Sequence, residues 1–172
     1  MRDALSQLSM HHVELALRIV VGVVLGGLIG WERNVEARHF GLRIHMLTSL
    51  AAAGFSVAAL EAVGWARLQN IEADPFRILE AVVSGVALLA AGTIIKGDGQ
   101  VKGLTTGVGL WLAGAIGVAA GAGMYAVAVF IATLSFAILY GLRKRPQQRP
   151  SAAREGAEGA EGGGDMAKES NS

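Results

Sequence analysis

Residues 21–33 read VGVVLGGLIGWER, and this stretch decides the fold class. An unbroken apolar run is followed by a tryptophan, a glutamate and an arginine. Its glycines at 22, 26 and 30 are four residues apart, so a helix presents them as one smooth stripe. In lipid, such a stripe lets a second helix backbone approach closely. We therefore predict a membrane helix that packs through glycine, whether inside the chain, at a dimer interface or along a backbone-lined pathway.

The composition also indicates a membrane protein. Of 172 residues, 52% are hydrophobic and 17% are charged, and the mean hydropathy is +0.46. Soluble domains carry roughly 25% charged residues. The net charge of +1 gives no basic footprint for nucleic acid, so no nucleic-acid partner is expected. The chain has no cysteine, which excludes disulfides and thiolate metal sites.

Long apolar runs predict the number of membrane spans. A bilayer span needs about 20 mostly apolar residues. Three runs have about this length, at 13–31, 44–63 and 78–95. The fourth run, 104–142, has no charged residue and is about twice one span, so we expect it to fold back at residues 121–123, Gly-Ala-Gly. The expected fold class is an all-α membrane protein, a bundle of about five transmembrane helices packed through small residues. A partly re-entrant 104–121 segment is the alternative.

Lysine and arginine predict the orientation. With five spans, nine of these residues fall on one side of the membrane and four on the other. The positive-inside rule then puts the N-terminus outside and the C-terminus in the cytoplasm. We divide the chain into an extracytoplasmic segment (1–12), a transmembrane domain (13–142) and a basic, then disordered, cytoplasmic tail (143–172). The end of the tail is rich in Gly, Ala, Glu and Ser and has no aromatic residue, which is typical of disorder.

Ionisable residues at the predicted outer ends are the first candidate functional group. Asp74 precedes a proline, which is typical of a helix N-cap. Glu14 and Arg18 are four apart and can pair on one helix face, and Arg77 and Glu80 are three apart. Arg18 and Glu80 fall inside apolar windows, where ionisable groups often mark function. Mutual pairing with snorkelling is one alternative reading, and an acidic site for magnesium is another.

The predicted inner loop at 93–107, TIIKGDGQVKGLTTG, is the second candidate group. Its backbone and the start of the following helix could bind an anion through free amides, with Thr93, Lys96, Thr105 and Thr106 nearby. A charged turn whose threonines cap that helix explains the same residues. No complete catalytic motif is found, so we predict no enzyme and no catalytic, cofactor or metal-binding residue.

A set of short motifs in fixed order resembles one known family. The motifs are Arg18, GGLIGWER (26–33), GLRIH (41–45), DPFRI (74–78), VVSG (82–85), AGTIIK (91–96), KGLTT (102–106) and Leu110-Trp111. Over roughly residues 18–142 the chain resembles the MgtC/SapB family of bacterial inner-membrane proteins. It looks like a short, SapB-like member without the C-terminal soluble domain. The resemblance implies a multi-pass protein of the bacterial plasma membrane with links to magnesium limitation and virulence.

The resemblance extends the candidate set to positions that match the family's motifs. These are Arg18, Glu32, Arg33, Arg43, His45, Asp74, Arg77, Thr93, Lys96, Thr105, Thr106 and Trp111. Glu80 departs from the family's pattern, and so do Ala87, Leu88 and Ala90 in the same predicted helix. These departures put in doubt any partner contact that this helix makes in other members.

Two functions follow from these observations. The first is a non-enzymatic regulator that binds other membrane proteins, and the resemblance implies the F-type ATP synthase as one such partner. The alternative is a small ion channel or transporter, for magnesium or another ion, that acts as an oligomer. The outer end of its ion path would then be lined by four ionisable residues, Arg18, Asp74, Arg77 and Glu80. Membrane lipid and a second copy of the chain are the other expected partners.

Overall fold

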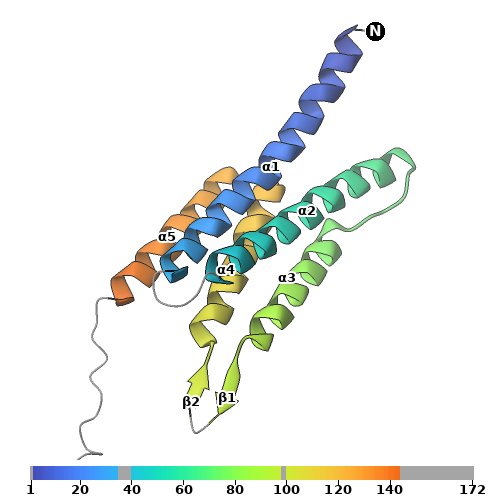
Figure 1. Ribbon diagram of the computed structural model, residues 1–172. Helices are drawn as coiled ribbons and strands as arrows, with labels where there is room; N and C mark the ends of the chain where they lie inside the picture. Colours follow the sequence, from blue (N-terminus) through green and yellow to red (C-terminus); the bar gives the residue numbers. More distant parts are fainter. Residues whose placement is uncertain (1, 35–39, 98–99, 144–172) are drawn as a thin grey trace, which may run out of the picture. The chain divides into compact units, whose positions relative to one another are not determined.

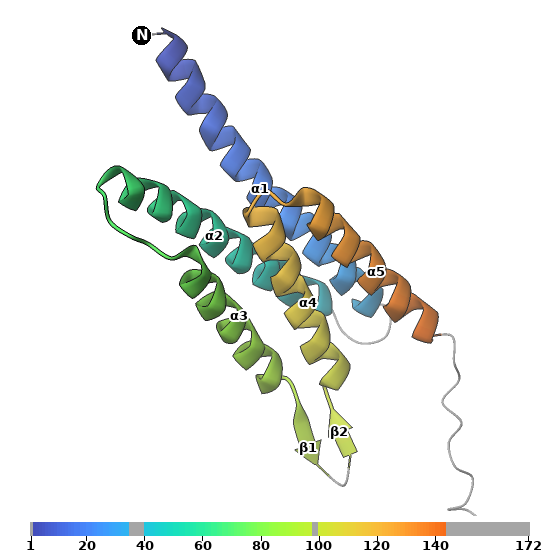
Figure 2. The same cartoon turned by 180° about the vertical axis from the view of Figure 1, so that it is seen from behind.

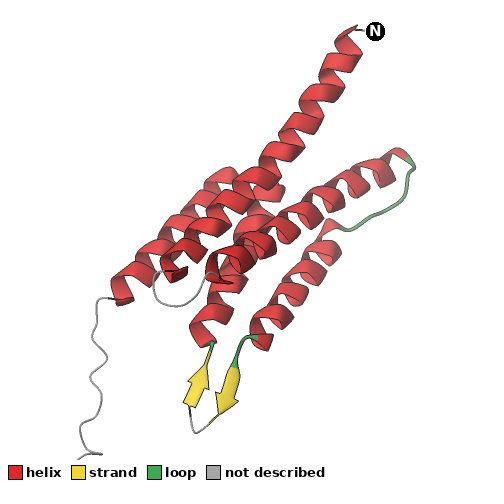
Figure 3. Ribbon diagram, viewed as in Figure 1, coloured by secondary structure: helices red, strands yellow, loops and turns green. Residues whose placement is uncertain are grey.

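The structure is a computed structural model that describes residues 2–34, 40–97 and 100–143. These residues form five helices and one β-hairpin (Figure 1, Figure 3). The elements are α1 (Arg2–Asn34), α2 (Phe40–Leu68), α3 (Pro75–Gly92), β1 (Ile95–Gly97), β2 (Gln100–Lys102), α4 (Leu104–Gly121) and α5 (Tyr125–Arg143). The predicted all-α membrane class with five helices is confirmed. Nearly all of the predicted cytoplasmic tail lies outside the described residues.

The glycine stripe of α1 packs inside the chain, against α2. A Cβ added to Gly30 would lie 2.8 Å from the Cα of Leu42, and one added to Gly22 would lie 3.2 Å from the Cβ of Ala53. At Gly26 an added Cβ would collide with the side chain of Ser49. The Ser49 hydroxyl donates a hydrogen bond to the Gly22 carbonyl across this contact, at 2.7 Å. Glycine is therefore what allows α1 and α2 to come this close.

Glycines of α4 make the same kind of contact with α2 and α3. A Cβ added to Gly117 would collide with the carbonyl of Ser49, and one on Gly114 would lie 2.6 Å from Val86 in α3. In the view from behind, α4 lies between α3 and α5 (Figure 2). The side chains of Leu110 and Ile116 in α4 are fully buried. Helix α4 is thus a central element, and its glycine content serves packing within the chain.

Helix α5 follows α4 after a tight turn, as the sequence predicts. Gly123 has φ 78°, a left-handed conformation that glycine adopts without strain, and α5 begins two residues later. Ala128 and Ala132 of α5 are fully buried or nearly so, in the same core cluster as Ile29 and Ile116. Helix α4 is continuous from Leu104 to Gly121.

The helix boundaries and the α3–α4 connection differ from the prediction. Helix α3 ends at Gly92, and residues 95–97 pair with 100–102 as antiparallel strands, Lys96 opposite Val101. The expected span reached residue 95, and residues 93–107 were predicted as a loop, so the β-hairpin was not predicted. Isoleucines 94 and 95 and Val101 are β-branched and flank a glycine-rich turn, a composition that favours strands. Helix α1 also starts earlier than predicted, at Arg2.

Four helices are long and apolar enough to cross a membrane. Their apolar segments are Ser9–Trp31, Gly41–Leu68, Pro75–Gly92 and Leu104–Gly121. The apolar part of α5, Tyr125–Gly141, is shorter. The chain is therefore a multi-pass membrane protein by the length and composition of its helices.

The close approach of α1 to α2 gives a first testable prediction. Gly26→Ala should lower the free energy of unfolding by about 1–3 kcal/mol, because the added methyl group collides with Ser49. Gly54→Ala is the matched control on α2. Its added Cβ meets nothing within 4 Å, so stability should stay equal or rise slightly. Unfolding in mixed micelles measures both, and equal stability of the two variants would contradict this packing.

Candidate functional site

His45 lies where α1, α2 and α4 meet. Its side chain is fully buried, and its Nδ1 donates to the Gly41 carbonyl at 2.6 Å, because a carbonyl oxygen can only accept. An added Cβ on Gly30 of α1 would lie 3.1 Å from the Cβ of His45, and one on Gly109 of α4 would lie 2.6 Å from Nε2. The imidazole therefore sits against both neighbouring backbones. The resemblance placed His45 among the candidates, and the structure shows that His45 leaves no room for a side chain at Gly30 or Gly109.

Ser49 is a second buried polar residue of α2, one helical turn after His45. It is fully buried and joins α2 to α1 through the hydrogen bond to the Gly22 carbonyl. Thr48 beside it is also buried and donates to the Ile44 carbonyl on its own helix at 2.8 Å. Ser49 and Gly109 were not among the predicted residues. The signal for Ser49 was spacing, since it follows His45 by four residues and so shares its helix face. Gly109 is far from His45 in the sequence, so no spacing indicates their contact.

Residues 35–39, which connect α1 to α2, lie outside the described residues. The side chains of Glu32 and Arg33, at the end of α1, lie outside the described set, so their predicted role stays a prediction. Arg43 is exposed in the first turns of α2. Trp31 at the end of α1 is 68% exposed, which is typical of an aromatic residue at the headgroup level.

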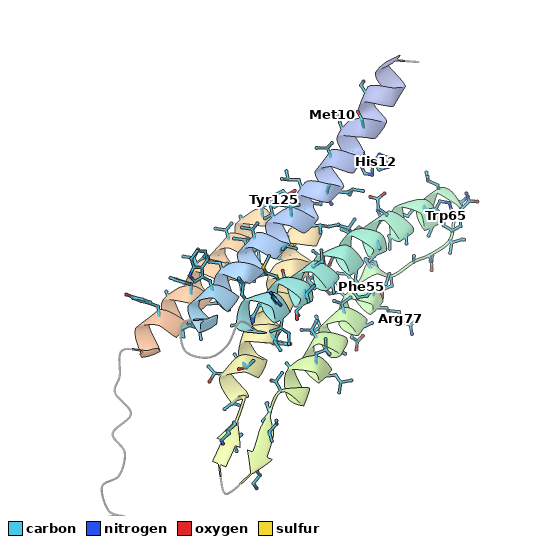
Figure 4. The ribbon with its side chains drawn as sticks, in the orientation of Figure 1. Met10, His12, Phe55, Trp65, Arg77 and Tyr125 are labelled. Atoms are coloured by element: carbon cyan, nitrogen blue, oxygen red, sulfur yellow. The ribbon has the colours of Figure 1, made fainter. Side chains whose placement is uncertain are left out.

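Arg18 of α1 lies at the turn between α4 and α5. It donates to the carboxylate of Glu14 one turn earlier, which confirms the predicted pair. A Cβ added to Gly123 would lie 3.3 Å from the guanidinium carbon. Tyr125, labelled in Figure 4, is the first residue of α5 and follows this turn. Arg18 thus ties α1 to the α4–α5 turn, a contact that sequence spacing could not show.

A second contact joins α1 to α2 at the same end. The Nε2 of His11 lies 3.2 Å from a carboxylate oxygen of Glu61, and both side chains are about half exposed. The pair is charged only when His11 is protonated. Within the described residues, no group of three His, Asp or Glu side chains could hold a metal ion.

The start of α3 carries Asp74, Arg77 and Glu80. The carboxylate of Asp74 accepts from the Phe76 amide at 2.9 Å, so Asp74 is the predicted N-cap, and proline occupies the first helical position. Arg77 and Glu80 are both exposed, and no described residue forms an ion pair with either. The structure therefore does not bring Arg77 and Glu80 together, and it leaves both outside the Glu14–Arg18 pair.

The α3–α4 connection positions the remaining candidates. Thr93 is the C-cap of α3, and its hydroxyl donates to the Ala90 carbonyl at 2.7 Å. Gly103 is the N-cap of α4, has φ 84° and makes no side-chain cap bond. The expectation that threonines cap α4 was wrong, because Thr105 and Thr106 already lie inside its first turn. Lys96 and Lys102 are exposed on the hairpin, and Trp111 on α4 is 48% exposed.

Comparison with known proteins gives a family for this chain. The model of the MgtC family matches residues 19–147. The "Putative magnesium transporter YhiD" of Escherichia coli K12 is 32% identical over 129 residues, which cover 73% of this chain and 59% of that protein. An uncharacterized Synechocystis protein is 38% identical over 116 residues (67% and 47%), and Protein MgtC of Brucella abortus is 40% identical over 101 residues (59% and 40%).

This chain therefore spans about three fifths or less of the length of these curated relatives. No solved structure matches it.

The contact between His45 and Gly109 gives a second prediction. Gly109→Ala should lower the free energy of unfolding by about 1–3 kcal/mol, because the new methyl group meets the imidazole. In a His45→Ala background the same change should cost much less, because the colliding atoms are gone. The four proteins of this double-mutant cycle are compared by unfolding in micelles. Strict additivity of the two changes would show that the residues do not touch.

Proposed function

The chain belongs to the MgtC family, and we propose that it is a non-enzymatic protein of the bacterial inner membrane that modulates another membrane protein by direct contact. The expected setting is adaptation to magnesium limitation or survival in a host, as the sequence resemblance implies. The observation that carries the proposal is the position of Glu80 on α3.

Helix α3 exposes one face to the membrane. Only Val86 and Ala90 of α3 are buried, against the rest of the bundle. Glu80, Ser84 and Leu88 are spaced four apart and are all exposed, with Leu88 at 75%. We call these three residues the outward face of α3.

A carboxylate on this face is costly in lipid. Glu80 is five residues into the helix, about 8 Å along its axis from Pro75. Ionisable residues inside a membrane span usually pair or face protein, because burying an unpaired charge in hydrocarbon is expensive. No described residue of this chain pairs with Glu80. A partner protein with a basic or hydrogen-bonding side chain at this depth would supply the missing contact.

The packing of the other helices also favours contact over conduction. Helices α1, α2 and α4 meet through glycines at backbone distance, and Ile29, Leu110 and Ile116 are fully buried between the helices. In a single copy packed this way, side chains rather than water fill the space between the helices. The F-type ATP synthase is the partner that the sequence resemblance implies. Because Glu80 and Leu88 depart from the family's pattern, the partner of this face is identified without assuming the synthase.

A transporter that acts as an oligomer is the second candidate function. The name of YhiD supports it, and the outward face of α3 could then join copies of the chain. Magnesium flux into liposomes that contain the purified protein distinguishes the two functions. Magnesium flux that disappears in Asp74→Asn or Glu80→Gln would favour the transporter.

Photo-crosslinking from the outward face tests the interaction proposal. A benzoylphenylalanine placed at Ser84 should form an adduct with one specific membrane protein in native membranes, identified by mass spectrometry. Glu80→Gln should lower the adduct yield several-fold, and Glu80→Asp should keep most of it, because the charge is retained. The same crosslinker at Val129, which is 48% exposed on α5, is the matched control. An equal yield with Glu80→Gln, or adducts only between copies of this chain, would contradict the proposal.

A further inference from the structure

A polar hollow lies where α2 leads into α3. Its volume is about 770 Å³. The lining residues are Arg67, Arg77 and the connecting segment 70–74. Trp65 precedes it on α2 and is 63% exposed (Figure 4), which is typical of the headgroup level of a bilayer. The hollow therefore lies at the depth where lipid headgroups are found.

The hollow presents charges of both signs. Arg67 and Arg77 supply two guanidinium groups, and Glu72 and Asp74 supply two carboxylates. No described residue forms an ion pair with Arg67, Arg77 or Glu72. Asp74 uses one oxygen to cap α3. The hollow thus has no net charge but offers separate partners for an anion and for a cation.

An apolar groove lies next to the hollow, between α2 and α3. Its volume is about 390 Å³. The lining includes Ala51 and Phe55 of α2 and Ile78, Ala81, Gly85 and Leu89 of α3. On α3, Arg77, Ala81 and Gly85 are four residues apart, so the arginine of the hollow stands above the groove on the same helix face.

The length of the groove matches one lipid leaflet. From Ile78 to Leu89 the axis of α3 rises by about 16 Å. The hydrocarbon core of a bilayer is about 30 Å thick, so one leaflet accounts for about 15 Å. The groove thus runs from headgroup depth to near the middle of the membrane. Its length and its mostly apolar lining fit a single acyl chain.

We propose that the hollow and the groove together bind one phospholipid with an ethanolamine headgroup. Arg67 and Arg77 donate to its phosphate, and the carboxylates of Glu72 and Asp74 accept from its ammonium group. One acyl chain lies in the groove against Phe55 and Gly85. Arginine suits phosphate because its planar guanidinium donates two parallel hydrogen bonds.

The two carboxylates decide the headgroup. A phosphatidylglycerol headgroup has a net negative charge and no ammonium group, so it leaves Glu72 without a cation. A choline headgroup has a cation but no N–H group to donate to a carboxylate. Of these three headgroups, only ethanolamine satisfies both halves of the hollow. We therefore expect selectivity for phosphatidylethanolamine over both other lipids.

The test uses the purified full-length chain in lipid-free micelles. Dioleoyl-phosphatidylethanolamine, -phosphatidylglycerol and -phosphatidylcholine are titrated separately, and bound lipid is counted by native mass spectrometry. One ethanolamine lipid should bind about tenfold more tightly than either other lipid. Arg67→Gln with Arg77→Gln should abolish binding of the single lipid. Glu72→Gln should remove the preference over phosphatidylglycerol while binding itself is retained.

Gly85→Leu tests the groove, and Gly92→Leu is its matched control. An added Cβ meets nothing within 4 Å at either glycine, so both variants are expected to fold. Gly85 lines the groove and Gly92 does not. Lipid binding should fall about tenfold in Gly85→Leu only. Three results would overturn the proposal. Gly85→Leu could bind lipid as tightly as the wild type, Gly92→Leu could lose binding to the same extent as Gly85→Leu, or the three lipids could bind with equal affinity. Melting temperatures without lipid show whether each variant is folded.

Discussion

Backbone-to-backbone contact between helices is the constraint on which this structure depends. Association in lipid relies on close packing and interhelical hydrogen bonds, because lipid is as apolar as the side chains. Gly26 of α1 and Gly117 of α4 both reach α2 at Ser49, from two sides. The Ser49 hydroxyl adds a buried hydrogen bond at this crossing. Because α1, α2 and α4 pack this closely, they enclose His45. The side chains of α3 lie at the edge of the helix bundle.

The position of α3 at the side of the bundle explains why both proposed binding surfaces lie on it. Because α3 buries so few of its residues, its outward face carries Glu80 and its other side leaves an apolar groove toward α2. The proposed protein contact and the proposed lipid use different sides of the same helix. Glu80, Ser84 and Leu88 belong to the first, and Ala81 and Gly85 belong to the second. A lipid in the groove would fill the space that α2 and α3 leave open. It would thereby stabilise α3, the helix that the partner protein contacts.

Much of the fold could be predicted from the sequence, but the partners of each residue could not. Apolar runs gave the helices and Asp74-Pro75 gave the start of α3, because these signals are local. The glycine spacing of α1 predicted close packing but not that α2 receives this stripe together with Gly117 and Gly121 of α4. The contact between Gly109 and His45 joins residues far apart in the chain, so no spacing shows it. The β-hairpin was missed because the apolar run continues from α3 into its isoleucines without a break.

The proposed contact requires that the rest of this chain leaves the outward face of α3 uncovered, so that another protein can bind there. The native chain has no cysteine, so single nitroxide labels along α3 report each position separately. In liposomes of the purified protein, the measurement is collision of each label with dissolved oxygen. We expect the collision rate to follow a helical period, with the highest values at 84 and 88 and the lowest at 86 and 90. Low values at 84 and 88 at every protein-to-lipid ratio would contradict it, because this face would already be covered.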